Sequence, residues 1–227
     1  MNRRLEAIMA HIPQNGRGVI DVGTDHGYLP AALFQRGYTG RLIAADINAE
    51  PLSKAKRTAE SIGAEDVISL RLCDGLDGCD SSEVDTIVIA GMGGDTICGI
   101  LDRAEWCMAR EYTLILQPMT KCEILRYWLV YNEFEIISEE LVRDDRLYQI
   151  ITACFGGHQR LNDAELYTGS TALIGGDPLF PELRGKLERR FASAVDGMRE
   201  STETEIIDRR RLYEEILNQL RDMEGGR

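Results

Sequence analysis

The sequence predicts an α/β fold in which a parallel sheet with helices on both faces ends in an antiparallel hairpin. Short apolar runs alternate with helical patterns over the first half of the chain, as in parallel sheets that are covered on both faces. Two longer apolar runs follow, joined only by residues 143–146. So short a link joins antiparallel neighbours, because a parallel crossover needs about a dozen residues. The parallel strands are expected at residues 18–22, 41–45, 67–72, 86–90 and 113–116, and the hairpin strands at 134–142 and 147–155.

Helices are expected between these strands, where apolar residues recur at helical spacing. Near the start, the apolar run from Leu5 to Ile12 is interrupted by Glu6 and His11, which predicts an amphipathic helix rather than a signal peptide. No apolar run approaches the roughly 20 residues that span a bilayer, so we expect a cytoplasmic protein that does not bind membranes. The inter-strand helices are expected at residues 28–35, 49–61, 95–103 and 120–131.

The end of the chain differs in character from the rest. Residues 169–177 form a connector of small residues, so we expect a main domain at 1–168 and a helical unit at 169–227. Apolar residues of this unit recur at coiled-coil spacing, which predicts two helices packed as an antiparallel hairpin. The same pattern also fits a helical cap packed on the sheet or a dimerisation element. We expect the protein to be a monomer or a weak homodimer. The apolar positions are Leu187, Phe191, Ala194 and Met198 in one helix, and Ile206, Tyr213, Ile216, Leu220 and Met223 in the other.

Charge and cysteine content limit the possible partners. The 227 residues include 38 acidic and 26 basic side chains, a net charge of −12, which repels nucleic acid at long range. A polyanionic partner would therefore need local basic patches. The six cysteines contain no C-x-x-C pair and suit a reducing compartment, and the three scattered histidines make a metal site unexpected.

The most informative segment, residues 19–30 (VIDVGTDHGYLP), combines an apolar strand, a glycine turn and the start of a helix. Glycines at 23 and 27 allow a sharp turn and the close approach of a ligand, and the N-terminus of the helix attracts negative charge. The next apolar run ends on Asp46, where a carboxylate holds the ribose hydroxyls of a nucleoside in doubly wound folds. The glycine turn and the carboxylate at the end of the next strand together predict a nucleoside cofactor.

Three further polar or glycine-rich segments follow the third, fourth and fifth strands, at the sheet edge where α/β folds bind ligands. Each of them also fits an ordinary turn. Five parallel strands that end in an antiparallel hairpin are the strand inventory of the class I methyltransferase fold, which favours S-adenosylmethionine over a nicotinamide cofactor. The segments are Asp74-Gly75, residues 90–94 (AGMGG) and Gln117-Pro118-Met119.

The segments DVGTDHGYLP, IAGMGG and LILQPM, with the charged link before Leu-Tyr-Gln-Ile, resemble the bacterial tRNA (adenine(22)-N1)-methyltransferase family. The resemblance covers nearly the whole chain, including a Gly-Asp-Pro-Leu entry at 176–179 into the helical hairpin. It implies S-adenosylmethionine as the methyl donor, tRNA as the partner, a class I Rossmann-like domain and a coiled-coil-like tail. Two positions depart from the family pattern: Met119 stands where asparagine is frequent, and Asp145-Arg146 where Gly-Lys is common.

The resemblance also implies roles for individual residues. Asp21, Gly23 and Asp25 would line the methionine side of the cofactor, and Asp46 would hold the ribose. Asp74 and Gly75 would bind the adenine, Ala90, Gly91, Met92 and Gly93 would form a floor near the sulfonium, and Gln117 and Pro118 would flank the target base as catalytic residues. His26 and Ile47 complete the expected cofactor set.

The chemistry of adenine N1 limits the mechanism. N1 has an in-plane lone pair and needs no deprotonation, so catalysis rests mainly on proximity and orientation. N1 lies on the Watson–Crick edge, so the base must be unpaired or flipped out. Asp25 is the candidate to stabilise the resulting positive charge or to accept the N6 proton, and capping of the next helix explains Asp25 equally well.

The tRNA itself would be bound by an aromatic side chain and by basic clusters. Tyr28 is a candidate to stack on a base, but a core or helix-packing role is favoured for it. Acidic residues are interspersed among the basic ones, so a solvated, ion-paired helix also explains them. Methylation of another RNA base or of a small molecule, and an inactive cofactor- and RNA-binding protein, are the alternative functions. The basic candidates are Arg146, Arg184, Arg189 and Arg190, with Arg3, Arg4, Arg143, Lys186 and residues 209–211 as further clusters.

Overall fold

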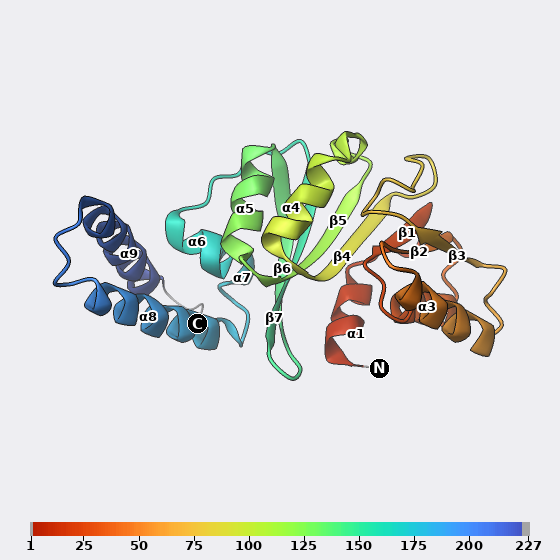
Figure 1. Cartoon of the computed structure of the whole chain (residues 1–227), viewed down its shortest axis with the longest axis horizontal. Helices are drawn as coiled ribbons and strands as arrows, with labels where there is room; N and C mark the ends of the chain where they lie inside the picture. The colour runs from red at the N-terminus through yellow and green to blue at the C-terminus, as the bar shows by residue number, and fades with distance from the viewer. Residues whose placement is uncertain (1, 224–227) are drawn as a thin grey trace.

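The computed structural model describes residues 2–223 and contains one seven-stranded sheet with the order β3-β2-β1-β4-β5-β7-β6. The first five strands are parallel, and β7 pairs antiparallel with both β5 and β6. The expected parallel sheet with a terminal antiparallel hairpin is therefore confirmed (Figure 1). The strands are β1 (Gly18–Val22), β2 (Arg41–Asp46), β3 (Ile68–Leu72), β4 (Thr86–Gly93), β5 (Thr113–Thr120), β6 (Phe134–Arg143) and β7 (Leu147–Phe155).

Helices cover both faces of the sheet. Consecutive strand residues point to opposite faces, so Val19 packs with α1, α2 and α3 whereas Ile20 packs with α4 and α5. The expected inter-strand helices are confirmed to within two residues at each end. The helices are α1 (Arg3–Ala10), α2 (Tyr28–Gln35), α3 (Ala49–Ser61), α4 (Gly94–Asp102), α5 (Cys122–Tyr131), α6 (Asp163–Thr168), α7 (Thr171–Ile174), α8 (Phe180–Gly197) and α9 (Thr204–Asp222), with a short 3₁₀ turn at Glu105–Cys107.

Strands β4 and β5 run several residues beyond their expected ends at 90 and 116. Met92 pairs with Pro118 and Gly93 with Thr120, with register shifts on either side of Met92. Gly91 takes a φ of +83°, which L side chains rarely adopt, so this glycine allows the irregular strand to continue. The expected strand ends are therefore too early, because pairing between the two strands continues beyond their apolar runs.

The region between the sheet and the helical hairpin contains two short helices that the sequence pattern did not predict. Asn162 caps α6 by accepting from the backbone N–H of Glu165 at 2.9 Å, and Glu165 bonds back to the Asn162 N–H. Helix α7 follows, with Ile174 buried. The expected small-residue connector is therefore partly helical, and its Ile174 packs into the core of the helix pair.

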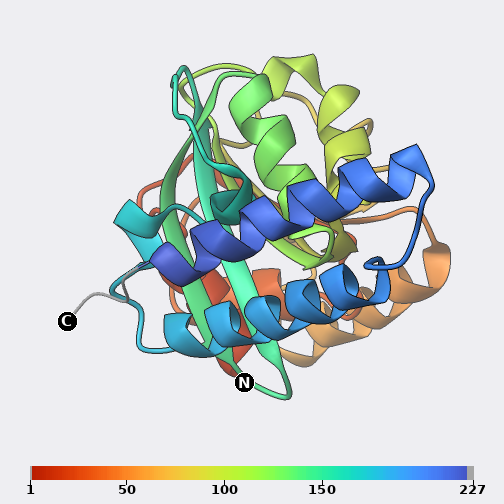
Figure 2. The same cartoon turned by 90° about the vertical axis from the view of Figure 1, so that its left-hand side faces the viewer.

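Helices α8 and α9 run in roughly opposite directions at one end of the molecule (Figures 1 and 2). Their shared core includes Phe191, Ile216 and Leu220, which confirms the predicted hairpin. The same core includes Leu141 of β6 and Ala164 of α6, so the helix pair is joined to the sheet. The division at residue 168 stays a prediction. Among residues 2–223, no helix has the length and apolar character needed to cross a membrane.

A fully buried ion pair holds this junction. Arg126 of α5 donates through Nε to Glu139 Oε1 of β6 at 2.7 Å, and both side chains are inaccessible to solvent. Arg126 also donates to the carbonyl of Leu166 at 2.9 Å and to Gln149 Oε1 at 2.7 Å. Glu139 Oε2 accepts from the Ser170 N–H at 2.6 Å. These bonds satisfy both charges and tie α6 and α7 to the sheet.

Candidate active site

The site is built at the carboxyl ends of the parallel strands, where the chain turns sharply after β1. Gly23 has a φ of +76°, and its N–H and that of Thr24 donate to the Ala45 carbonyl at 2.8 and 3.0 Å. A Cβ on Gly23 would meet Met92 Cε, the flexible end of that side chain, so the positive φ is the main reason for glycine here. Gly27 caps α2 with a φ of +66°, and a Cβ there would lie 2.9 Å from Ala55 Cβ. Both glycines of the motif are thus required by local geometry.

A cavity of about 350 Å³ opens beside Gly23. Asp46 uses Oδ1 to accept from the Asn48 N–H at 2.7 Å, which holds the carboxylate at the tip of β2. Ile47 next to it is 61% exposed and presents an apolar surface to the cavity. Six predicted cofactor residues line this cavity: Gly23, Asp46, Ile47, Asp74, Gly75 and Met92.

Arg103, at the end of α4, also lines this cavity and was not among the predicted residues. Its Nη2 donates to Asp74 Oδ1 at 2.8 Å, and its Nη1 donates to the Gly99 carbonyl at 2.9 Å. The guanidinium therefore orients the carboxylate that was assigned to the adenine. No signal in the sequence pointed to Arg103, because it lies 29 residues from Asp74 on another element.

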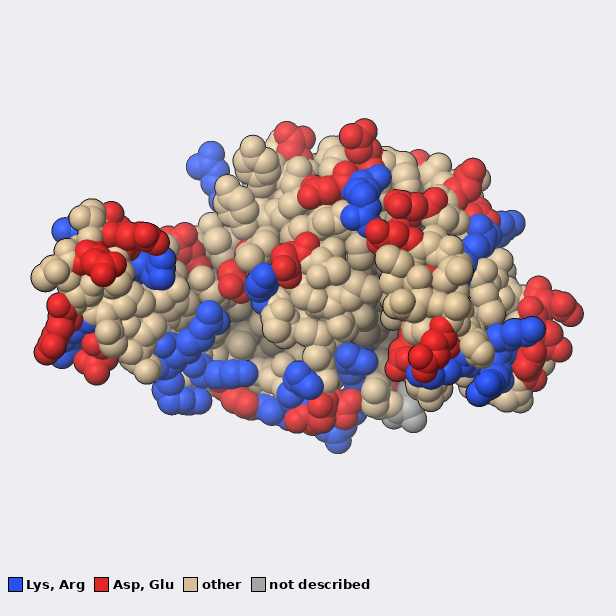
Figure 3. All heavy atoms as spheres, viewed as in Figure 1, with Lys and Arg blue, Asp and Glu red and all other residues tan. Residues whose placement is uncertain are grey.

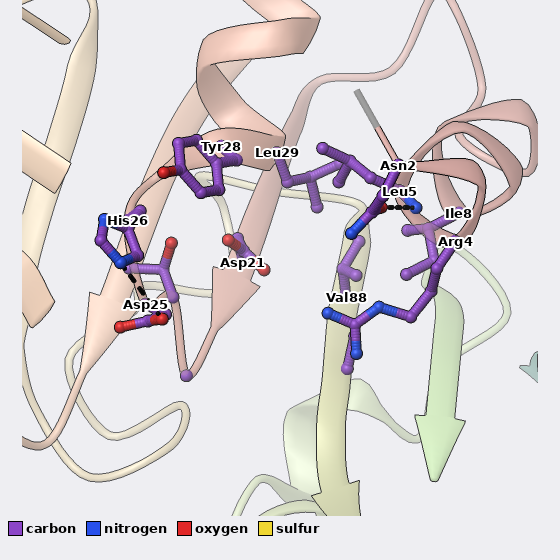
Figure 4. A pocket seen from close by; sticks show the side chains of 13 residues that line it. Asn2, Arg4, Leu5, Ile8, Asp21, Asp25, His26, Tyr28, Leu29 and Val88 are labelled. Atoms are coloured by element: carbon purple, nitrogen blue, oxygen red, sulfur yellow. Dashed lines mark hydrogen bonds and ion pairs between the residues drawn. The ribbon is translucent and has the colours of Figure 1, made fainter. Parts of the chain in front are cut away.

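A smaller cavity of about 120 Å³ lies on the other side of Gly23, between α1 and the end of β1 (Figure 4). Asp21 lies in its middle, with Asp25 and His26 on one side and Arg4 on the other. Burial raises the pKa of Asp21 to about 6; a hydrogen bond from Thr24 and the charge of Arg4 oppose this rise, and the charge of Asp46 adds to it. Asp21 is therefore a carboxylate at neutral pH but is close to its titration range.

The rim of the smaller cavity carries an exposed charge and an aromatic stack. The Asp25 carboxylate is 72% exposed and lies 3.4 Å from His26 Nε2 and 3.8 Å from Lys54 Nζ. His26 and Tyr28 stack with ring centroids 5.0 Å apart and planes 5° apart. Tyr28 is 56% exposed, so its ring is available at the mouth rather than buried in the helix packing.

The predicted catalytic pair Gln117 and Pro118 is buried and lines neither cavity. Gln117 Nε2 donates to the Pro118 carbonyl at 2.9 Å, and Gln117 Oε1 accepts from Arg4 Nη1 at 3.2 Å. Gln117 therefore reaches the smaller cavity only through Arg4, which does line it. In the predicted floor, Ala90 lines this cavity, whereas Gly91 and Gly93 line neither. The sequence alone indicates Arg4 only as part of a basic cluster.

The four predicted tRNA-binding arginines have different surroundings. Arg146 lies over the Tyr148 ring at 5.8 Å, and Arg190 lies over the Tyr167 ring at 5.7 Å. Arg184 donates to the Met223 carbonyl and pairs with Glu188 at 3.2 Å, so it supports the helix pair. Arg189 is exposed and forms no ion pair within residues 2–223. Lys and Arg side chains gather along the lower edge of the molecule, over α8 and the β6–β7 hairpin (Figure 3).

Residues 2–223 contain no group of three or more His, Cys, Asp or Glu side chains that could hold a metal ion. The six cysteines are unpaired, and burial raises the pKa of each thiol. These cysteines are therefore protonated at neutral pH, as is usual for structural residues.

Comparison with known proteins agrees with this geometry. The family model described as a methyltransferase domain matches residues 1–151. The tRNA (adenine(22)-N(1))-methyltransferase of Bacillus subtilis is 34% identical over 164 residues, which are 72% of this chain and 68% of that protein. The crystal structure of the B. subtilis M1A22 tRNA methyltransferase TrmK superposes with a TM-score of 0.83 at 27% identity, covering 96% of this chain and 98% of that chain.

A second solved relative, M. capricolum TrmK in complex with S-adenosyl-homocysteine, has a TM-score of 0.80 at 26% identity over 97% of this chain and 99% of that chain. This chain therefore has the class I methyltransferase fold, with its strand order and terminal antiparallel hairpin, followed by the C-terminal helix pair. The chain belongs to the tRNA (adenine(22)-N(1))-methyltransferase family.

Proposed function

We propose that this protein transfers a methyl group from S-adenosylmethionine to N1 of adenosine 22 in tRNA. The observation that carries the proposal is a pair of cavities that both have Gly23 in their walls. One is lined by the predicted nucleoside-binding residues, and the other by the oppositely charged Asp21 and Arg4. The family supports it, because the B. subtilis relative is named for this reaction. The reaction belongs in the cytoplasm, where its tRNA substrate would be found.

The residues of the larger cavity fit the nucleoside part of the methyl donor. Asp46 Oδ1 accepts from the Asn48 N–H, so Oδ2 would accept from the two ribose hydroxyls. The exposed Ile47 side chain would form an apolar wall beside the adenine. Asp74, oriented by Arg103, would accept from the adenine amino group. When bound, S-adenosylmethionine supplies a methyl group on a positively charged sulfur.

The rim of the smaller cavity fits the target adenine. Tyr28 presents an exposed ring already stacked on His26, and this ring is suited to stack on a flipped base. Adenine N1 attacks through its own lone pair, so these residues act mainly by holding the base in line. The exposed Asp25 carboxylate lies beside them and would stabilise the positive charge that methylation leaves on the ring.

The basic edge in Figure 3 fits the tRNA backbone. The net charge of −12 opposes non-specific binding of RNA, so local arginines and lysines must supply the phosphate contacts. Arg189 and Lys186 are exposed on α8, and Arg146 is exposed in the hairpin turn. Shape recognition by the helix pair, with a few phosphate contacts, would reconcile an acidic protein with a tRNA partner.

Incubation with labelled methyl donor and bulk bacterial tRNA tests the reaction. We expect label in 1-methyladenosine after digestion, and none when a tRNA transcript carries G at position 22. Binding of S-adenosylhomocysteine without transfer to any RNA would instead indicate an inactive binding protein. Label in a different nucleoside would assign another RNA base.

A charge-reversal variant tests the RNA surface separately. Lys186→Glu with Arg189→Glu is expected to weaken tRNA binding by at least about tenfold while the affinity for S-adenosylhomocysteine is unchanged. Lys56→Glu on α3, at the opposite end of the sheet, is the control. Equal tRNA affinity in both variants would contradict the assignment of this edge.

A further inference from the structure

The first turn of α1 is held against the β6–β7 hairpin by Arg4. The Arg4 guanidinium carbon lies 5.2 Å from the centroid of the Tyr148 ring, within the range of a cation–π contact. The Arg4 backbone N–H donates to Asp144 Oδ2 at 3.5 Å. Tyr148 is buried, and its hydroxyl donates to Asp145 Oδ1 at 2.6 Å, which fixes the ring in the turn. The hairpin thus determines where the Arg4 side chain lies.

The same guanidinium reaches the smaller cavity. Arg4 Nη1 donates to Gln117 Oε1 at 3.2 Å, and Figure 4 shows the group pointing into the cavity opposite Asp21. A guanidinium carries five N–H donors in a planar fork that matches a carboxylate. Within residues 2–223, the Arg4 guanidinium donates a hydrogen bond only to Gln117. Most of its donors are therefore available to a ligand.

Asp21 gives this small cavity a second, opposite charge. Its carboxylate lies close enough to Arg4 for the guanidinium charge to lower its pKa, while burial raises the pKa to about 6. Tyr148 lines neither this cavity nor the larger one. A guanidinium and a carboxylate on the walls of one small cavity match the charges of an α-amino acid, which presents a carboxylate and an ammonium group on one carbon.

We propose that Arg4 binds the α-carboxylate of the methyl donor and that Tyr148 is the residue that positions Arg4 for this contact. Asp21 then accepts from the ammonium group of the same amino acid. The inference rests on the proposed function, because it assumes a cofactor with a methionine moiety. It assigns the start of α1 and the antiparallel hairpin to the methyl-donor site, in addition to the parallel strands.

Three ligands that differ only in the amino acid moiety test the assignment by calorimetry. S-adenosylhomocysteine has both charged groups, its decarboxylated analogue keeps the ammonium group, and 5′-methylthioadenosine has neither. Arg4→Gln is expected to weaken S-adenosylhomocysteine binding by about 10- to 100-fold and to leave the other two ligands unchanged. Arg3→Gln, the exposed neighbour on α1, is the matched control and should change none of them.

Variants of Tyr148 test the positioning role. Tyr148→Leu removes the ring and should weaken the binding of S-adenosylhomocysteine several-fold but not that of 5′-methylthioadenosine. Tyr148→Phe keeps the ring and should bind S-adenosylhomocysteine with the affinity of the wild type. In the Arg4→Gln background, Tyr148→Leu should cause no further loss. Equal weakening of all three ligands, or no rescue by phenylalanine, would overturn the proposal. If the wild type binds none of the three ligands, it is the proposed function itself that fails.

Discussion

Replacing Asp21 by asparagine is expected to stabilise the fold while weakening the methyl-donor site. The pKa of Asp21 is raised from 3.8 to about 6 by burial, a rise of about two units. At about 1.4 kcal/mol per unit, the ionised carboxylate costs up to about 3 kcal/mol of folding free energy at neutral pH. Asparagine keeps the shape without the charge, so Asp21→Asn should regain part of this cost. The midpoint of thermal unfolding should rise by several degrees.

The pH dependence of the stability difference between Asp21→Asn and the wild type tests whether the raised pKa of Asp21 is its cause. A carboxyl whose pKa is raised on folding contributes stability below its unfolded pKa and loses that contribution as pH rises through its folded pKa. The advantage of Asp21→Asn over the wild type should therefore be small below about pH 4, grow up to about pH 6 and stay constant above. Urea unfolding at pH 4, 5 and 7.5 measures this difference.

Asp25→Asn is the control for this experiment, because the Asp25 carboxylate is exposed and its replacement should change stability by less than about 0.5 kcal/mol. A variant at Asp21 that is no more stable than the wild type at pH 7.5, or one whose advantage does not depend on pH, would refute the argument. Calorimetry on the same protein should show weaker S-adenosylhomocysteine binding.

Three further predictions concern the site and its support. Gly23→Ala is expected to cost about 1–2 kcal/mol and to weaken S-adenosylhomocysteine, because φ is +76° and a Cβ would meet Met92; unfolding and calorimetry measure both effects. Asp46→Ala should weaken S-adenosylhomocysteine by about 10- to 100-fold while adenine alone binds as before, since only the ribose contact is lost. Arg126→Ala should cost about 3–5 kcal/mol in urea unfolding, because it leaves Glu139 buried and unpaired, whereas replacing both by apolar residues should cost much less.

Local patterns in the sequence were sufficient for most of the fold. Strand β1 and helices α2 and α3 begin and end where predicted, because alternating apolar runs and helical spacing report which side chains face a core. Asp46 and Asp74 were found because each follows a strand directly, and the ends of parallel strands meet at one edge. The extensions of β4 and β5 were missed because they depend on pairing between strands rather than on either strand alone.

The amino-acid sequence by itself determined the α/β class, the glycine turn at Gly23 and the carboxylates at the strand tips. Only the tertiary structure decided which distant charges meet: Arg4 reaches Gln117 across 113 residues, and Arg103 reaches Asp74 across 29. Hydrophobic periodicity is a property of neighbouring residues, whereas these contacts depend on the strand order and on where α1 and the hairpin pack against the sheet. The parts of the site contributed by α1, α4 and the antiparallel hairpin therefore became visible only in the folded chain.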